Sequence, residues 1–121
     1  MKINLIIDQF LSELKGIKNA SPNTILAYKR DLNQFKLFLE NKNISDINLI
    51  TKKHIRLFIV TLNSNGISTS SISRKLTTLR GVFVYAIKNG IIETNPLKNI
   101  SNPKIKMTVF FDKASLNKKE L

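Results

Sequence analysis

The chain has 121 residues, 42% of them hydrophobic, which favours one packed domain with a modest core over disorder. It contains no cysteine, which excludes disulfides, thiol catalysis and cysteine-ligated metals. Lysine and arginine number 20 against 8 acidic residues, a formal net charge of +12. The apolar run at the N-terminus is broken by Asp8 and Glu13 and no segment is long enough to span a membrane, so we expect a soluble cytoplasmic protein.

The positive charge is unevenly distributed along the chain. Residues 47–92 contain no acidic residue. The basic residues of this range are Lys52, Lys53, Arg56, Arg74, Lys75, Arg80 and Lys88. A solvated helix face usually mixes both signs, because oppositely charged neighbours stabilise it. A surface of one sign therefore predicts a polyanionic partner, with nucleic acid ranked first and an anionic membrane second.

Two amphipathic helices are expected in the first third of the chain. The first carries apolar residues at three- and four-residue steps, namely Ile3, Ile7, Phe10, Leu14 and Ile17, and ends at residues 18–20. Ser21 as N-cap and Pro22 at the first helical position begin the second, which ends at residues 41–43. Its buried stripe is predicted to be Ile25, Tyr28, Leu32, Phe35 and Leu39, and its opposite side Leu26, Arg30, Asn33 and Leu37.

Two further helices follow a linker at residues 46–50. Thr51 is expected to cap the third, which carries the apolar residues Ile55, Phe58, Ile59 and Leu62 and stops at residues 63–66. The fourth begins after Ser68 or Thr69 and ends at Gly90. Asn95 and Pro96 predict one more short turn of helix. The expected fold class is all-α, with four helices.

The fourth helix separates into two faces on a helical wheel. The core-facing arc is predicted to contain Ile72, Leu76, Leu79, Phe83, Ala86 and Ile87. The opposite arc contains Ser70, Arg74, Thr77, Thr78, Gly81, Tyr85 and Lys88, with Lys75 and Arg80 at the border. Because glycine disfavours helix, Gly81 indicates that something packs against its face.

The outer face has the chemistry of a phosphate-binding surface. Ser70, Ser71 and Ser73 lie at the helix start, where free N–H groups and the positive dipole end attract phosphate. Arg74 is long and planar enough to reach a base edge such as that of guanine. The alternative is that one serine is a cap and the cations serve solubility; the absence of acids favours nucleic-acid binding.

No catalytic or metal-binding constellation is found in the sequence. His54 is the only histidine and lacks companion ligands, so a capping or surface role is favoured. The acidic residues are dispersed, and no nucleophile has a partner base. We therefore expect no cofactor and no enzymatic activity from this chain.

Four stretches stand in order over residues 3–103, namely SPNTILAYKRDLNQFKLFL, ITKKHIRLFI, the run from Ser68 and NGIIETNPL. In these stretches the chain resembles the N-terminal core-binding (SAM-like) domain of tyrosine recombinases, in the Xer and phage-integrase branch. Its matching positions are Thr24, Tyr28, Asp31, Leu32, Phe35, Ser71, Ile72, Arg74, Leu79, Arg80, Asn95 and Pro96.

The resemblance implies a domain that clamps one face of duplex DNA at a recombination core site. In this family the N-terminal halves of the second and fourth helices meet the major groove. Here these positions are Asn23, Thr24, Ala27 and Arg30, and then Ser70, Ser71, Ser73, Arg74, Lys75 and Thr78. Asp31 and Arg80 also match, although an ion pair bracing the two helices explains them equally well. Ile6 and Leu11 are candidates for contact with a neighbouring protomer, against the alternative of a wide buried stripe.

The resemblance also implies a division into residues 1–103, the DNA-binding domain, and residues 104–121, a basic linker and the start of a catalytic domain that is absent. This linker is longer than in the family and lacks its Leu-Pro pair. The full-length parent would be a site-specific recombinase that cleaves and rejoins DNA through a tyrosine, as a tetramer on two DNA sites. We expect the isolated domain to be monomeric.

Two other function classes remain open from the sequence. A helical adaptor with a basic face for an acidic protein would expose an apolar patch and ignore DNA. An RNA-binding protein would expose aromatic side chains for stacking, and Tyr85 alone is well placed for this.

Overall fold

The computed structural model describes residues 1–102 and contains four α-helices. They are α1 (Ile3–Gly16), α2 (Pro22–Asn41), α3 (Lys52–Ser64) and α4 (Thr69–Lys88), with a 3-10 turn at Ile47–Leu49 between α2 and α3. The all-α expectation is confirmed. The expected linker at residues 104–121 lies outside the described residues. Within the described part, none of the helices combines the length and apolar character needed to cross a membrane.

Three helices begin at the caps that the sequence predicts. The Ser21 hydroxyl accepts the backbone N–H of Thr24 at 3.2 Å, and the Ser68 hydroxyl accepts that of Ser71 at 3.2 Å. At α3, His54 Nδ1 accepts the backbone N–H of Thr51 at 3.0 Å. The capping role of His54 is therefore confirmed, and each cap satisfies a backbone donor that the helix leaves free.

The helix ends use left-handed backbone positions. Gly66 and Gly90 have φ values of 79° and 70°, and each follows the last turn of its helix. Asn43 takes the same role after α2, with a φ of 59°. Glycine and asparagine tolerate this region, so the chain reverses without strain from a Cβ.

The hydrophobic core is wider than the predicted stripes. Ile6 has no exposed surface and Leu11 is half-buried, so α1 buries a broad face, as the alternative for these residues proposed. Ile17 is 79% exposed and its predicted burial is wrong, because it caps the C-terminus of α1 and lies beyond the packed turns. The linker before α3 also enters the core, where Ile47 and Ile50 are buried.

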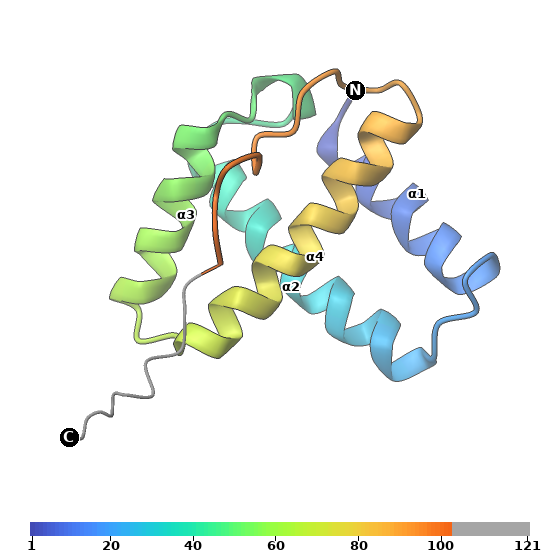
Figure 1. The fold of residues 1–121 in the computed structure, drawn as a ribbon, viewed down its shortest axis with the longest axis horizontal. Helices are drawn as coiled ribbons and strands as arrows, with labels where there is room; N and C mark the ends of the chain where they lie inside the picture. Colours follow the sequence, from blue (N-terminus) through green and yellow to red (C-terminus); the bar gives the residue numbers. More distant parts are fainter. Residues whose placement is uncertain (103–121) are drawn as a thin grey trace.

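The arrangement of the helices is dominated by a crossing of α2 and α4 (Figure 1). The two helices begin at the lower right and lower left of the view and cross near mid-length, so their N-terminal halves spread on the same side of the crossing. α1 lies on one flank and α3 on the other.

After α4 the chain turns back and runs between α3 and α4 (Figure 1). Leu97 is buried and anchors this segment, and Asn95 Oδ1 accepts the backbone N–H of Leu97 at 2.9 Å. The helical turn expected at Asn95 and Pro96 is a hydrogen-bonded turn, in which Lys98 N–H donates to the Asn95 carbonyl at 2.9 Å.

Candidate nucleic-acid interface

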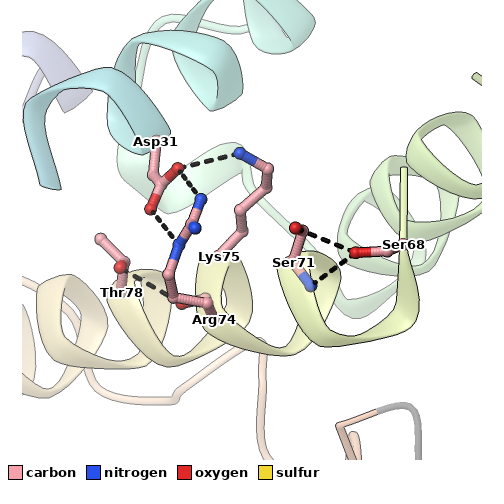
Figure 2. Close-up of polar contacts among 6 residues, drawn as sticks. All are labelled: Asp31, Ser68, Ser71, Arg74, Lys75 and Thr78. Atoms are coloured by element: carbon pink, nitrogen blue, oxygen red, sulfur yellow. Dashed lines mark hydrogen bonds and ion pairs between the residues drawn. The ribbon is translucent and has the colours of Figure 1, made fainter. Parts of the chain in front are cut away.

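A three-residue charge cluster joins α2 to α4 where they cross (Figure 2). Arg74 donates from Nε to Asp31 Oδ2 at 3.3 Å and from Nη2 to Asp31 Oδ1 at 3.0 Å. Lys75 Nζ donates to the same Oδ1 at 2.9 Å. We call Asp31, Arg74 and Lys75 the brace.

The carboxylate of the brace is buried and ionised. Asp31 is 3% exposed, and burial alone would raise its pKa. The hydrogen bonds and positive charges of Arg74 and Lys75 outweigh this effect and hold the pKa of Asp31 below its ordinary value. Two cations on one carboxylate leave the brace with a net positive charge.

Arg74 differs from its partners in exposure. The side chains of Asp31 and Lys75 are 2% and 10% exposed, whereas that of Arg74 is 51% exposed. The guanidinium therefore lies at the surface, with one edge on Asp31. Its Nη1 group has no hydrogen bond to any residue of the described range 1–102.

Two residues predicted for DNA contact lie in the interior instead. Thr78 is 2% exposed and its hydroxyl donates to the Arg74 carbonyl at 3.3 Å, so its predicted place on the outer face is wrong. Lys75 is 9% exposed and its ammonium faces Asp31, so its geometry supports the brace rather than a phosphate contact.

The predicted faces of α4 are wrong at these positions because α4 packs against three other helices. A Cβ on Gly81 would lie 3.0 Å from the ring of Phe10, so the partner that Gly81 accommodates is α1. Tyr85 packs edge-on against the same ring at 6.0 Å and is half-buried. Val82 is buried on this wider arc, and Ile87, predicted in the core, is 38% exposed.

The start of α4 presents hydroxyl groups that are partly committed to capping. The Ser68 hydroxyl lies 3.3 Å from that of exposed Ser70 and donates to that of half-buried Ser71 at 3.0 Å. Ser73 is half-buried, and its carbonyl accepts the Thr77 hydroxyl at 3.1 Å.

The predicted residues at the start of α2 are accessible. Asn23, Thr24 and Arg30 are exposed and Ala27 is half-buried. The Thr24 hydroxyl is 2.9 Å from that of Ser21. Arg30 precedes Asp31 directly and forms no ion pair within residues 1–102, so its charge is available at the surface beside the brace.

The alternative in which Arg80 pairs with Asp31 is wrong, although Asp31 does brace the two helices through Arg74 and Lys75. Arg80 instead donates to the Ile100 carbonyl and to Asn102 Oδ1. Asn102 Nδ2 lies 3.4 Å from the Ser73 carbonyl and 3.5 Å from the Thr77 hydroxyl. We call these contacts of Arg80 and Asn102 the clasp. The sequence carried no signal for the clasp, because its residues are far apart in the chain and have no distinctive pattern.

The described residues hold no cluster of three or more metal-ligating side chains. The predicted contact residues offer cations, hydroxyls and backbone N–H groups. These groups bind anions through charge and hydrogen bonds.

Comparison with known proteins assigns the chain to a family. The model of the phage integrase N-terminal SAM-like domain matches residues 7–90. The chain is 37% identical to tyrosine recombinase XerC of Oceanobacillus iheyensis over 103 residues, 85% of this chain and 34% of that protein. It is 40% identical to tyrosine recombinase XerD of Rickettsia prowazekii over 98 residues, 81% of this chain and 31% of that protein.

The chain thus spans about a third of the length of these curated relatives. No solved structure matches it significantly. The match of the family model covers α2, α3 and α4 entirely and most of α1, which includes the crossing and the brace. The chain belongs to the phage integrase N-terminal SAM-like domain family, in its Xer-like tyrosine recombinase branch.

Proposed function

We propose that this chain is the DNA-binding N-terminal domain of a site-specific tyrosine recombinase. The observation that carries the proposal is a pair of exposed arginines, Arg30 on α2 and Arg74 on α4, the second held at the crossing by the brace. Residues 47–92, which include α4, contain no acidic residue. Duplex DNA is a polyanion with closely spaced phosphates, and a surface of this sign attracts it over long distances.

The N-terminal halves of α2 and α4 would hold the duplex at the recombination core site. Asn23, Thr24 and Arg30 on α2, and Ser70, Ser71, Ser73 and Arg74 on α4, are the proposed contacts, with Ala27 allowing close approach. Hydroxyls and backbone N–H groups would fix the register on phosphates, and Arg74 would read a base edge. The buried positions of Lys75 and Thr78 support an indirect role for these two residues.

The remaining functions belong to a longer recombinase. Because the relatives are named tyrosine recombinases, we propose that this chain occurs in a protein that cleaves and rejoins DNA through a tyrosine outside the matched region. Such a protein would act as a tetramer on two DNA sites, and the domain alone would be monomeric.

The test is binding of the chain to a labelled 30-base-pair duplex of generic sequence across a salt series. We expect the logarithm of the binding constant to fall linearly with the logarithm of the salt concentration. Each phosphate that the domain neutralises should contribute about 0.9 to the steepness of this line, and several phosphates should contribute. Arg30→Gln should lower this slope by roughly one phosphate. Arg56→Gln on α3 is the matched control for the α2–α4 surface, and it should leave the slope closer to that of the unchanged chain. Absence of binding at low salt would overturn the proposal.

One observation favours a second function, that of a protein-binding adaptor. Leu26 and Leu37 on α2 are each 61% exposed, as an adaptor would require. An adaptor would show no salt-dependent DNA binding, so the same salt series separates the two functions.

A further inference from the structure

We propose that Asp31 is a positioning residue for DNA recognition, which holds the Arg74 guanidinium with its free edge toward the base that Arg74 reads. This inference rests on the proposed function and adds a residue that itself touches no DNA. Asp31 is buried on α2, and its carboxylate is aimed at α4 (Figure 2).

The hydrogen-bond pattern leaves the useful edge of Arg74 free. Asp31 occupies the side edge, formed by Nε and one hydrogen of Nη2. The end edge, formed by Nη1 and the second hydrogen of Nη2, still offers two donors. Two parallel donors on one edge are what the O6 and N7 atoms of guanine accept. The brace thus uses the donors that base recognition does not need.

Holding the side chain in advance also favours binding. Arginine is long and flexible, so a free Arg74 would lose rotamer freedom when it met DNA. Two hydrogen bonds from one guanidinium to one carboxylate fix the plane of the group as well as its position. The side chain of Arg74 then loses its rotamer freedom when the domain folds and not when it binds DNA.

Lys75 explains how a carboxylate can be present at a DNA-binding surface. An Asp31–Arg74 pair alone would be neutral and would weaken attraction for phosphate. Lys75 donates to the same oxygen from a buried position, so the brace keeps a net positive charge at the exposed guanidinium. The lysine therefore acts through Asp31 and not through contact with DNA.

The experiment compares sequence preference among matched variants of the chain. The probe is a library of 30-base-pair duplexes with randomised central positions, from which bound sequences are selected and counted. Arg74→Ala should reduce preference at one base pair by about 10-fold. Asp31→Asn should reduce preference at the same base pair, and the double variant should lose no more than Arg74→Ala alone.

Two further variants separate positioning from stability. Lys75→Met removes the other buried contact of Asp31 and should leave the base preference in place. Asp31→Asn/Lys75→Met fills the site with neutral side chains, which are often tolerated in place of a buried ion pair, and it should lose the preference while remaining folded. Circular dichroism checks the folding of each variant.

A measurement without DNA tests the positioning directly. The Nε–H signal of Arg74 in nitrogen-15 relaxation should show an ordered side chain in the unchanged chain and a mobile one in the Asp31→Asn/Lys75→Met variant. An equally mobile Arg74 in both would overturn the inference whatever the DNA result.

The outcomes also separate this inference from the proposed function. Binding with a base preference that Arg74→Ala abolishes and both Asp31 variants retain would overturn the positioning role alone. Binding without any base preference would also overturn the positioning role alone, because Arg74 would then read no base. Failure of the unchanged chain to bind any duplex at low salt would overturn the proposed function, and the inference with it.

Discussion

At the scale of single residues, Asp31 links stability to recognition. Its carboxylate is the acidic member of the charge cluster that joins α2 and α4, and it is buried with a pKa below the ordinary value. The hydrogen bonds and positive charges of Arg74 and Lys75 together outweigh the desolvation that burial imposes. The residue that would orient Arg74 is therefore also one on which the crossing of the two helices depends.

This dependence predicts a pH effect on stability. The unfolded chain takes up a proton on Asp31 near the ordinary pKa of 3.8, whereas the folded chain does so only at lower pH. The stabilisation is thus complete above that pKa and is lost as the pH falls through the lowered folded value. Asp31→Asn should cost about 2 kcal/mol at neutral pH, the scale of a buried charged hydrogen bond.

Urea unfolding of the unchanged chain and of Asp31→Asn between pH 7 and pH 3 measures this effect. The difference in unfolding free energy between the two should shrink as the pH falls below about 4, since the ordinary aspartate pKa lies there. Other carboxylates, including that of Asp46, are common to both chains and cancel in the difference. A difference that is the same at every pH would show that the charge of Asp31 contributes nothing.

The sequence predicted Asp31 and Arg74 as residues of interest, but not their pairing. The helical wheel predicts a single core-facing arc for α4, whereas the helix in the structure contacts α1, α2 and α3. Thr78 and Lys75 are buried because α2 crosses α4 at this point. A crossing of two helices depends on packing between distant segments, which a single-helix pattern does not contain.

At the scale of the elements, local capping chemistry explains why the helix bounds were predictable. Ser21, Thr51 and Ser68 precede α2, α3 and α4, and each takes part in hydrogen bonds at the helix start. Gly66 and Gly90 end α3 and α4 with positive φ. These signals lie within a few residues of each boundary, so no tertiary information was required to find them.

Replacing the cap of α4 should therefore destabilise the domain. Ser68→Ala removes the acceptor for the Ser71 N–H and should lower the unfolding free energy by about 1 kcal/mol. Because the same change loosens the first turn of α4, DNA affinity should fall as well. Urea unfolding measures the first effect and the salt series the second.

Ser70→Ala is the matched control in the same turn. Ser70 is exposed, and its hydroxyl contacts that of Ser68 without accepting a backbone N–H among the hydrogen bonds of the described residues. This variant should leave stability within about 0.5 kcal/mol of the unchanged chain. Equal losses in the two variants would contradict the assignment of Ser68 as the cap.

At the scale of the whole molecule, the clasp connects the end of the described chain to the middle of α4. Arg80 holds the Ile100 carbonyl and Asn102, and Asn102 reaches back to Ser73 and Thr77. The returning segment is also anchored by buried Leu97. The end of the described chain therefore lies beside the proposed DNA-binding half of α4.

Arg80→Gln should release residues 100–102 while leaving the four helices intact. Loss of the two charged hydrogen bonds should cost about 1–2 kcal/mol of unfolding free energy, with helix content unchanged by circular dichroism. Amide hydrogen exchange should accelerate at Ile100 and Asn102. Arg56→Gln, on the exposed face of α3, is the control and should accelerate exchange at neither residue. Unchanged protection in Arg80→Gln would contradict the clasp.

The clasp has a thermodynamic consequence for the proposed recombinase. Asn102 contacts the backbone carbonyl of Ser73, the residue before Arg74. The clasp and the proposed DNA-binding surface of α4 therefore involve the same segment of this helix. Linkage between two equilibria is reciprocal: a duplex that binds the clasped form more tightly also tightens the clasp, by the same factor. Occupancy of the DNA site would thereby set how firmly Ile100 and Asn102 are held against α4.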